Sequence, residues 1–277
     1  MTVRVSVVVP AFNNAAYIAE TIDSILHQSF TDFELLIADH ASTDSTKEII
    51  GRFAGDERVR ILETKAGGGA ARNWNRVSRE ASGEFIKLVC GDDLLDPTIL
   101  EKQVAALDGE PSATLVASRR ALVDSAGVTL VESRGLPGLS GLIAGRRAVR
   151  SAVRAGSNIF GEPACVLVRR NALESVGWWN AEFPYVIDEA TYAQLLLIGD
   201  LVAIPEQLAS FRLSSSQWSV ALAQSQARQV VGFHGSLAQD NPGFLSATDL
   251  LVGNLRARIT ARLRRLIYIV FRSRMGR

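Results

Sequence analysis

Two adjacent aspartates, Asp92 and Asp93, follow the apolar segment 84–89 and are the strongest candidates for chemistry in this sequence. Carboxylate oxygens are preferred ligands of hard divalent cations, which also bind the oxygens of a diphosphate. A carboxylate pair at the end of a strand is therefore suited to hold Mg²⁺ or Mn²⁺ against a diphosphate. The alternative is that the pair only begins a turn, with Asp96 capping the helix that follows Pro97.

Two further polar groups follow apolar segments in the same way. The segment 3–9 runs into Pro10 to Asn13, and the segment 33–38 runs into Asp39. In an open α/β sheet, ligands bind beyond the carboxyl ends of the strands. Three such groups at neighbouring strand ends favour a crevice with acidic walls over three unrelated turns.

An alternation of strands and helices positions these groups. Apolar, β-branched runs predict buried strands, and apolar residues at helical spacing between them predict helices. In the first hundred residues, strands are expected at 3–9, 33–38, 59–62 and 84–89. Helices are expected from Asn13 or Asn14 to about Gln28, from Ser42 or Thr43 through the apolar residues Ile49, Ile50 and Phe53, and from Ala70 to about Ala81. This order is typical of an α/β protein whose parallel sheet has helices on both faces.

After Pro97 the alternation becomes less regular. The later elements expected are a helix at 100–107, a strand at 113–118, a hairpin at 121–132 turning at 125–127, a strand at 165–168, a helix at 188–198 and a strand at 201–204. Pro205 is expected to stop the last of these strands. From Ser216 onward the pattern is helical, with an interruption at 241–243, so a boundary is expected near Ser214.

Composition narrows the class of protein. Of 277 residues, 47% are hydrophobic and 21% charged, as in ordinary globular enzymes. The 30 basic and 29 acidic residues give no reason to expect a nucleic acid partner. Cys90 and Cys165 match neither a disulfide framework nor a zinc spacing, which favours a reducing compartment. The run at 3–9 is too short for a signal peptide, and no eighteen consecutive residues are apolar, so a cytoplasmic location is expected.

The segments VSVVVPAFNN, IADHASTDST, AARNWN and FIKLVCGDDLLDP resemble, in order and spacing, the nucleotide-binding half of the family 2 glycosyltransferases with the GT-A fold. GEPACVLVRR, Gly177-Trp178-Trp179 and VIDEATYAQLLLIG resemble the acceptor half of that family. The resemblance covers roughly residues 3–213. It implies a GT-A domain at 1–214, divided near residue 110 into a nucleotide-binding half (1–110) and an acceptor half (111–214). The helical pattern from Ser216 onward, which the resemblance does not cover, adds an expected helical C-terminal extension at 215–277.

The resemblance implies an inverting transfer of a sugar from a nucleotide diphosphate sugar, with a UDP-sugar as the first expectation, to a hydroxyl of a glycan or lipid-linked acceptor. It implies that Asp188 is the catalytic base, because a carboxylate can take the proton of the attacking hydroxyl. Asp93 is expected to bind Mg²⁺ or Mn²⁺, which with Arg72 would stabilise the departing diphosphate. The residues expected to bind substrates are Pro10, Ala11, Phe12, Asp39, Arg72, Asn73, Asp92, Glu162 and Trp179.

Three positions depart from the family pattern. His40 and Cys90 stand where acidic residues are common, and Ile187 stands where the family has a glutamate before the base. We expect His40 to face the surface or the nucleobase and Cys90 to be a small buried residue. Because Glu189 directly follows Asp188, Glu189 stays open as an alternative base.

Three further features allow more than one interpretation. The cluster Gly67-Gly68-Gly69 lacks the spacing of a phosphate-binding motif and predicts a flexible turn. A second interpretation is that the helix after this turn presents its N-terminus to the diphosphate. Trp178 and Trp179 are adjacent and point in different directions, so one is expected in the core and the other on a sugar ring. Asn158, Glu162 and Pro163 are expected to form a lip on the acceptor side, or an ordinary loop.

The C-terminal segment carries eight arginines and no acidic residue between Arg256 and Arg277. Ile259, Leu263, Leu266, Ile267 and Val270 can form one stripe at helical spacing, with Arg258, Arg262 and Arg265 near its edges. This composition suits a basic helix on an anionic membrane surface. The alternative is a helix packed on the body or on a second subunit of a homodimer.

Two other functional classes stay open. A catalytically silent homologue that binds nucleotide sugars would fit His40 and Ile187. A nucleotidyltransferase would share the α/β plan, but the chain lacks an N-terminal glycine-rich loop with Arg and Lys. The product released from the donor, a nucleoside diphosphate, pyrophosphate or nothing, distinguishes the three classes.

Overall fold

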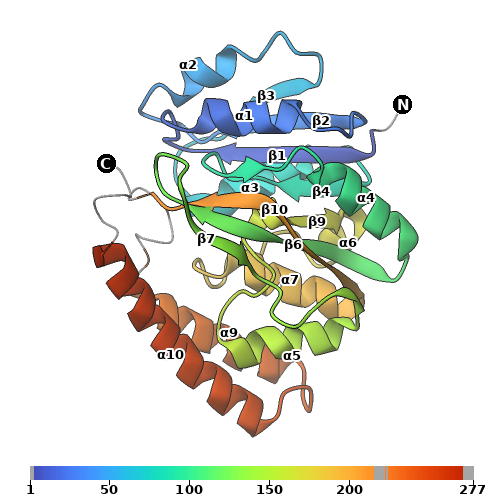
Figure 1. Ribbon diagram of the computed structural model, residues 1–277, viewed down its shortest axis with the longest axis vertical. Coiled ribbons are helices and arrows are strands. Elements are labelled where there is room, and N and C mark those ends of the chain that lie inside the picture. The colour runs from blue at the N-terminus through green and yellow to red at the C-terminus, as the bar shows by residue number, and fades with distance from the viewer. Residues whose placement is uncertain (1–2, 215–221, 223, 271–277) are drawn as a thin grey trace.

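The structure of the chain, a computed structural model, describes residues 3–214, 222 and 224–270 (Figure 1). A central mixed sheet is flanked by helices, and a pair of long helices follows at the C-terminal end. The strands are β1 (Val5–Ala11), β2 (Phe33–Asp39), β3 (Val59–Glu63), β4 (Phe85–Leu88), β5 (Leu94–Leu95), β6 (Ala113–Val123), β7 (Thr129–Arg134), β8 (Gly141–Ile143), β9 (Val166–Arg169) and β10 (Asp200–Arg212).

Helices occupy most of the segments between these strands. They are α1 (Ile18–Leu26), α2 (Thr46–Gly51), α3 (Gly69–Arg79), α4 (Ile99–Gly109), α5 (Gly145–Ala155), α6 (Arg170–Ser175), α7 (Ile187–Ile198), α9 (Gln226–Asp240), α10 (Ala247–Val270) and the 3₁₀ helix η1 (Pro163–Cys165). In the described part of the chain, no helix combines the length and the apolar character needed to cross a membrane.

The strand order of the sheet is β3-β2-β1-β4-β9-β6-β10-β5, with β7 added to β6 and β8 added to β10. The strands β1 to β4 pair in parallel, and β10 pairs in parallel with β6. Since β9 is antiparallel to both β4 and β6, all these parallel strands run in one direction. Their carboxyl ends therefore meet at a single edge of the sheet, together with the start of β9.

The core lies on both sides of this sheet. Every residue of β1 is buried, as expected of an apolar central strand with both faces covered. Helix α1 buries Ile18, Ile22 and Ile25, which repeat at helical spacing. The apolar pattern along the chain thus accounts for the layered packing that fixes the strand ends.

The predicted order of elements over the first hundred residues is confirmed, and so are the hairpin of β6 and β7 and the break between α9 and α10. Two helix starts were predicted too early. Helix α1 begins at Ile18, because the side-chain oxygen of Asn14 accepts a hydrogen bond from the N–H of Phe12 (2.9 Å) instead of capping a helix. Helix α2 begins at Thr46, whose N–H and hydroxyl both donate to Asp44 Oδ1.

Two further expectations about the sheet are corrected. The sheet is mixed rather than parallel, because β9 is inserted antiparallel between β4 and β6. Pro205 does not stop the last strand, and β10 continues to Arg212. Since proline lacks an N–H, the pairing of β10 with β6 shifts register between Ile204 and Gln207 and then resumes. The short elements β5, β8, α5 and α6 were not predicted.

The proposed boundary near Ser214 stays a prediction, because residues 215–221 and 223 lie outside the described part. Helix α10 packs on α5 and on α9, so the C-terminal helix contacts the part of the chain before residue 214 directly. The side chains of Leu266, Ile267 and Val270, and residues 271–277, also lie outside what the structure describes.

Candidate active site

The structure brings four predicted site residues together at the carboxyl edge of the sheet. Asp92 and Asp93 follow β4, Glu162 immediately precedes η1 and β9, and Asp188 lies in the first turn of α7. The carboxylates of Asp92 and Glu162 both act on the pKa of Asp93, and Glu162 also acts on the pKa of Asp188. Carboxylates from three separate segments therefore share one electrostatic environment.

Asp93 is fully buried and only partly satisfied. Its Oδ1 accepts a hydrogen bond from the N–H of Arg212 (3.2 Å), and its Oδ2 has no hydrogen-bond partner among the described residues. Burial raises the pKa of Asp93 well above its usual value, and the neighbouring carboxylates of Asp92 and Glu162 raise it further. A buried carboxylate of this kind is costly unless a cation compensates it.

The donor set fits a divalent cation that is shared with a substrate. Within the described ranges, no three His, Cys, Asp or Glu side chains form a metal site by themselves. Mg²⁺ in nucleotide-dependent enzymes is commonly held by one or two carboxylates together with substrate phosphates. The unpartnered Oδ2 of Asp93 is a suitable ligand for such a cation, and it faces an environment that is already rich in negative charge.

Arg212, at the end of β10, holds the aspartate turn in place. Its Nε donates to the carbonyl of Asp92 (3.1 Å) and its Nη1 to the carbonyl of Ser125 (3.1 Å). Its Nη2 pairs with Glu20 Oε2 (2.6 Å), and its guanidinium lies 4.6 Å from the ring centroid of Tyr17. This buried arginine was missed from the sequence, because β10 also carries Asp200 and Glu206 and so gives no local sign that Arg212 is buried.

Asp188 is held by two hydrogen bonds. Its Oδ2 accepts from the side-chain amide of Asn158 (2.9 Å), and its Oδ1 accepts from the N–H of Glu189 (2.8 Å). Burial raises the pKa of Asp188 to about 6, with a further upward contribution from Glu162. A carboxylate with a pKa near neutrality is well matched to accepting a proton during a reaction.

Glu189, the alternative base, lies in a different environment. Its side chain is buried, and its Oε1 has no hydrogen-bond partner in the described part of the chain. Burial raises the pKa of Glu189 to about 8, and the charge of Asp188 adds to this shift. At neutral pH Glu189 therefore holds its proton, which favours Asp188 as the base.

Glu162 is tied to Arg120, a second buried arginine that was missed from the sequence. Arg120 lies within β6 and is 3% exposed. Its Nη2 donates to Glu162 Oε1 (2.9 Å), its Nε pairs with Glu162 Oε2, and its Nη1 donates to the carbonyl of Arg134 (3.3 Å). The pair fixes the acceptor-side loop, which was expected as a lip, against the sheet.

Two residues at the ends of β1 and β2 have the geometry expected of a nucleoside site. Asp39 is buried, its Oδ2 accepts from the N–H of Ser42 (3.2 Å), and its Oδ1 has no partner among the residues described. Phe12, which follows Pro10 and Ala11, is 55% exposed and leaves its ring available to a nucleobase.

His40 is buried, so the expectation that it faces the surface is wrong, and the alternative that it faces the nucleobase stays a prediction. Its ring meets the ring of Phe12 edge-on, with centroids 6.0 Å apart. Its Nε2 donates to the carbonyl of Gly67 (2.9 Å), which identifies Nε2 as the protonated nitrogen, because a carbonyl can only accept. His40 therefore fastens the glycine turn to the end of β2 and supports the Phe12 ring.

The glycine turn carries Arg72 at the start of α3. Gly67, Gly68 and Gly69 all have positive φ angles, of 86°, 79° and 66°. A Cβ atom on Gly68 would lie 2.6 Å from Cδ of Arg72, so only glycine lets that side chain lie across the turn. Arg72 is exposed, and its Nη1 donates to the carbonyl of Ala66 (3.1 Å).

Asn73 belongs to the scaffold rather than to the substrate surface. It is buried, its Nδ2 donates to the carbonyl of Ala38 (2.8 Å), and its Oδ1 accepts from the hydroxyl of Thr64 (2.6 Å). Because both polar atoms of the amide are used within the protein, the expectation that Asn73 binds substrate is corrected. The residue instead braces the strand ends that carry Asp39 and Phe12.

Trp179 is the core member of the tryptophan pair. It is 4% exposed, its Nε1 donates to the hydroxyl of Ser78 (2.8 Å), and its ring packs edge-on against Trp74 and Tyr192. The expectation that Trp179 stacks on a sugar is therefore corrected, because neither face of its ring is open. Trp178 is half-buried and has a positive φ of 71°.

The two cysteines are unsuited to nucleophilic chemistry. Burial raises the pKa of the Cys90 thiol well above its usual value, and the charges of Asp93 and Asp92 raise it further. Burial also raises the pKa of Cys165 to about 12. Since the thiolate is the reactive form, both side chains stay protonated and inert at neutral pH.

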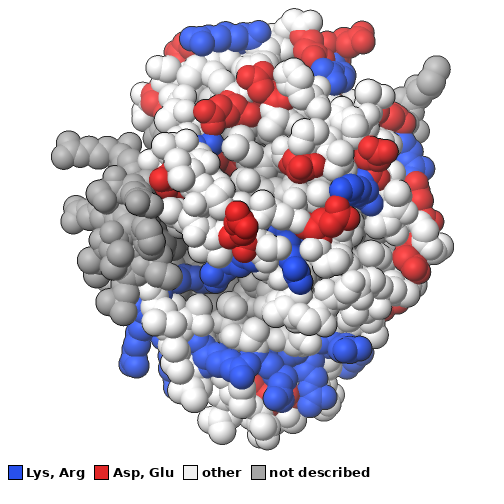
Figure 2. Space-filling model, viewed as in Figure 1, with Lys and Arg blue, Asp and Glu red and all other residues white. Residues whose placement is uncertain are grey.

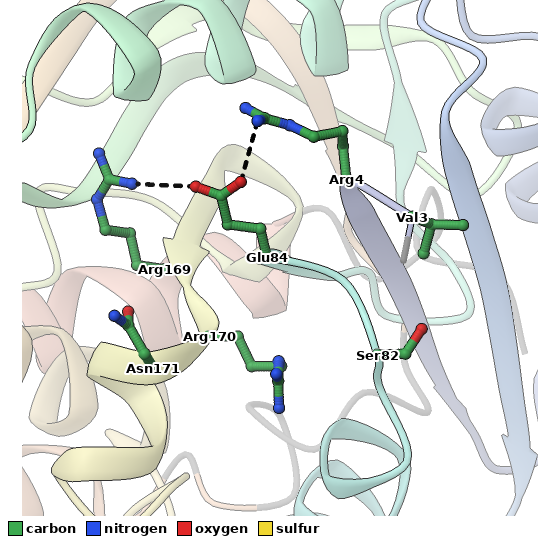
Figure 3. Close-up of a pocket in the computed structure, with 7 residues that line it drawn as sticks. All are labelled: Val3, Arg4, Ser82, Glu84, Arg169, Arg170 and Asn171. Carbon is green, nitrogen blue, oxygen red and sulfur yellow. Dashed lines mark ion pairs between the residues drawn. The ribbon is translucent and has the colours of Figure 1, made fainter. Parts of the chain in front are cut away.

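A cavity of about 330 Å³ lies at the other edge of the sheet (Figure 3). Glu84 lies between two arginines that line it, 3.0 Å from Arg4 and 3.5 Å from Arg169. Arg4 precedes β1 and Glu84 precedes β4, so this cavity opens at the amino ends of these strands. It contains none of the predicted site residues.

Solved structures with the same architecture identify the fold. The chain is similar to residues 1–349 of Staphylococcus aureus TarS in complex with UDP-GlcNAc, with a TM-score of 0.71, 18% identity, and coverage of 93% of this chain and 73% of that one. It is also similar to the mannosyltransferase PcManGT of Pyrobaculum calidifontis in complex with GDP-Man and Mn²⁺ (TM-score 0.68, 19% identity, coverage 98% and 76%). The fold is GT-A.

Sequence comparison identifies the family. The model of glycosyl transferase family 2 matches residues 6–177, and the chain belongs to this family. The glycosyltransferase GlyG of Streptococcus pneumoniae is 37% identical over 102 residues, which are 36% of this chain and 34% of that protein. TarS, a poly(ribitol-phosphate) β-N-acetylglucosaminyltransferase of S. aureus, is 31% identical over 138 residues. These are 48% of this chain and 22% of that protein. The matched segments span less than half the length of these curated relatives.

Proposed function

We propose that this glycosyltransferase moves a sugar from a nucleotide diphosphate sugar to a hydroxyl group of a glycan or lipid-linked acceptor, with inversion and with Mg²⁺ or Mn²⁺. The observation that carries the proposal is the buried, unpartnered Oδ2 of Asp93 beside Asp92 and Glu162, at the same strand edge as Asp188. A site of this kind offers a cation ligand, Asp93, on the side of the sugar donor and a proton acceptor, Asp188, on the side of the hydroxyl acceptor.

In the proposed reaction, Asp188 takes the proton of the acceptor hydroxyl as its oxygen attacks the anomeric carbon. The nucleoside diphosphate leaves from the opposite face of the sugar, so a single displacement inverts the configuration. When bound at Asp93, a divalent cation supplies charge stabilisation to the leaving diphosphate. Asn158 orients Asp188 through its hydrogen bond to Oδ2.

On the donor side, Asp39 and Phe12 would hold the nucleoside and Arg72 would reach the diphosphate. The exposed Phe12 ring and the unpartnered Oδ1 of Asp39 support this placement. The two solved neighbours bind UDP-GlcNAc and GDP-Man, so both bases belong in a donor screen. A UDP-sugar remains our first expectation.

We also propose a cytoplasmic location, because Cys90 and Cys165 are both free and unpaired thiols are usual in a reducing compartment.

A donor panel tests the proposal. The full chain is incubated with UDP- and GDP-sugars, with Mn²⁺ or with chelator, and with a mixture of hydroxyl acceptors, and the released nucleotide is identified. Release of a nucleoside diphosphate from one donor, only when a divalent cation is present, is the expected result. Pyrophosphate release from a nucleoside triphosphate and a sugar phosphate would indicate a nucleotidyltransferase, and donor binding without release would indicate a silent homologue.

Paired variants test the assignment of the base. Asp188→Asn should lose transfer and keep donor affinity, because the nucleotide contacts that we propose lie on other elements. Glu189→Gln is the matched control, since that side chain is already protonated at neutral pH. Loss of transfer in Glu189→Gln with activity retained in Asp188→Asn would move the base by one residue.

A further inference from the structure

Helix α10 has the reverse of the residue distribution usual for a surface helix. Its buried positions carry small residues, namely Gly253, Ala257 and Ala261. Its large apolar residues face solvent instead, and their exposed fractions are 72% for Leu251, 57% for Leu255, 45% for Ile259 and 53% for Leu263. We call these four residues the outer stripe of α10. Their spacing of four residues gives a stripe about 18 Å long on one side of the helix.

The orientation of α10 is fixed by close packing on α5. A Cβ atom on Gly253 would lie 2.1 Å from the carbonyl oxygen of Val153, so the two backbones touch there. At the start of the helix, the buried Asp249 pairs with Arg150 (2.9 Å) and Arg154 (2.7 Å) of α5. Since α10 cannot rotate without breaking these contacts, the outer stripe faces away from the body.

Basic side chains surround this stripe. Arg258 and Arg262 are exposed and lie three residues after Leu255 and Ile259, next to the stripe on the helix surface. After Asp249 the sequence contains no acidic residue up to Arg277. Figure 2 shows lysine and arginine side chains gathered across the lower part of the molecule, where Figure 1 draws α5 and α10.

We propose that the outer stripe of α10 and its flanking arginines dock on an anionic lipid surface. An apolar stripe with basic edges matches such a surface, where the apolar side chains enter the headgroup boundary and the arginines meet lipid phosphates. A second copy of the chain fits less well. Pairing two such helices would place the arginines of one against the arginines of the other, without acidic partners on α10 after Asp249.

The docked helix would bring the catalytic edge to the lipid surface. Arg264 contacts the hydroxyl of Tyr185, which lies three residues before Asp188, and Arg265 Nη2 donates to the carbonyl of Gln224 (3.0 Å). The C-terminal end of α10 also lies on the side of the molecule where β10 ends (Figure 1). Access of a lipid-linked acceptor to Asp188 rests on the proposed function, whereas the lipid contact itself does not.

Co-sedimentation of the full chain with vesicles tests the contact. Vesicles of phosphatidylcholine alone are compared with vesicles containing about one third phosphatidylglycerol, a fraction chosen to carry a clear negative charge. We expect binding only to the anionic vesicles, and a loss of binding as the Debye length falls from about 10 Å at 0.1 M salt to about 3 Å at 1 M. Equal binding to both kinds of vesicle, or to neither, overturns the proposal.

Matched variants assign the binding to the stripe. Leu255→Gln with Ile259→Gln, and separately Arg258→Gln with Arg262→Gln, should each weaken partitioning roughly tenfold to thirtyfold. Ile198→Gln is the apolar control, because Ile198 is 57% exposed like Leu255, and Arg52→Gln with Arg79→Gln is the charge control. Thermal unfolding of each variant verifies that it folds.

Two outcomes of these variants overturn the proposal. One is an equal loss of vesicle binding in the control variants. The other is a dimer, seen by light scattering without lipid, that Leu255→Gln with Ile259→Gln converts to a monomer, because the stripe would then be an interface between two copies. Donor hydrolysis measured without lipid should be unchanged in the stripe variants, so a failure of the lipid contact is distinguishable from a failure of the proposed function.

Discussion

The backbone N–H of Arg212 donates to Oδ1 of Asp93 across 119 residues of chain, at a distance of 3.2 Å. This contact joins the end of β10 to the turn after β4, and it leaves Oδ2 of Asp93 without a hydrogen-bond partner in the described structure. The scaffold therefore satisfies one oxygen of the carboxylate and leaves the other open to the cation that we propose. Four of the predictions below depend on how carboxylates are held at this edge.

Asp93→Asn should separate catalysis from stability. Replacing the ligand oxygen should lower turnover at least about a hundredfold, since cation stabilisation of a leaving group is worth several kcal/mol. In chelator, however, the melting temperature should stay the same or rise. Burial raises the pKa of Asp93, which means that the fold disfavours its charge, and asparagine removes that charge. Kinetics with added Mn²⁺ and thermal unfolding with chelator measure the two effects.

Glu84→Gln is a suitable control for that experiment, because Glu84 is a half-exposed carboxylate at the other edge of the sheet. It should leave the Mn²⁺ dependence unchanged. An Asp93→Asn variant with full activity in Mn²⁺ would remove Asp93 from the cation site.

Arg212→Lys should act as a positioning defect. Lysine keeps the positive charge but cannot reach the carbonyls of Asp92 and Ser125 and the carboxylate of Glu20 at once. We expect the free energy of unfolding to fall by about 2–4 kcal/mol and the Mn²⁺ concentration for half-maximal activity to rise, because the aspartate turn loses its support. Activity titrated with Mn²⁺ at a temperature where the variant is folded tests this.

If Arg212 has only a structural role, the Mn²⁺ requirement of the folded variant will match that of the unmodified chain. Arg120→Lys provides the comparison on the acceptor side. It should disturb the Glu162 loop and leave the cation requirement less affected than Arg212→Lys does, because the hydrogen bonds of Arg120 go to Arg134 and Glu162 and only its charge acts on Asp93.

The contrast between Asp93 and Arg212 shows what the sequence could and could not reveal. Asp92 and Asp93 were recognisable because strand, turn and carboxylates are contiguous. Arg212 and Arg120 were not, because their roles depend on pairing between strands that are far apart in the chain. For the same reason, the antiparallel insertion of β9 and the continuation of β10 past Pro205 were missed. Both depend on which strands become neighbours.

Side-chain direction was a second limit. Two adjacent tryptophans must point in different directions, but only the packing shows that Trp179 is the buried one. The burial of His40 likewise depends on the glycine turn that folds over it. The pattern within a single helix or strand thus allowed that element to be predicted, whereas the contacts between elements could not be predicted from the sequence.

The rate of transfer should fall on the acid side with an apparent pKa near 6. Asp188 must be deprotonated to accept the acceptor proton, and burial raises its pKa to about 6. Above this value the base is in its active form, so the rate at saturating donor should be level there and drop about tenfold per pH unit well below it. A profile that keeps its full rate to pH 4.5 would exclude Asp188 as the base.

Asn158→Ala should move this acid limb to higher pH. The amide of Asn158 donates to Asp188 Oδ2, and this hydrogen bond lowers the pKa of Asp188 by favouring its charged form. Without the donor, the pKa of Asp188 rises, so the base is protonated over a wider range. A purely structural role for Asn158 would lower the rate at every pH and leave the midpoint of the profile in place.

Phe12 and Trp179 should respond to substitution in opposite ways. Phe12 is 55% exposed, so Phe12→Ala should change the free energy of unfolding by no more than about 0.5 kcal/mol. If its ring stacks on the nucleobase, the same variant should bind nucleoside diphosphate about tenfold more weakly, since such stacking is worth about 1–3 kcal/mol. Trp179→Phe loses the hydrogen bond to Ser78 and part of a buried ring, so it should cost about 1–2 kcal/mol of stability and leave nucleotide affinity unchanged.

Calorimetric titration with UDP and GDP measures the nucleotide affinity of both variants, and denaturant unfolding measures their free energy of unfolding. A loss of nucleotide affinity in folded Trp179→Phe, with normal affinity in Phe12→Ala, would contradict the placement of both side chains.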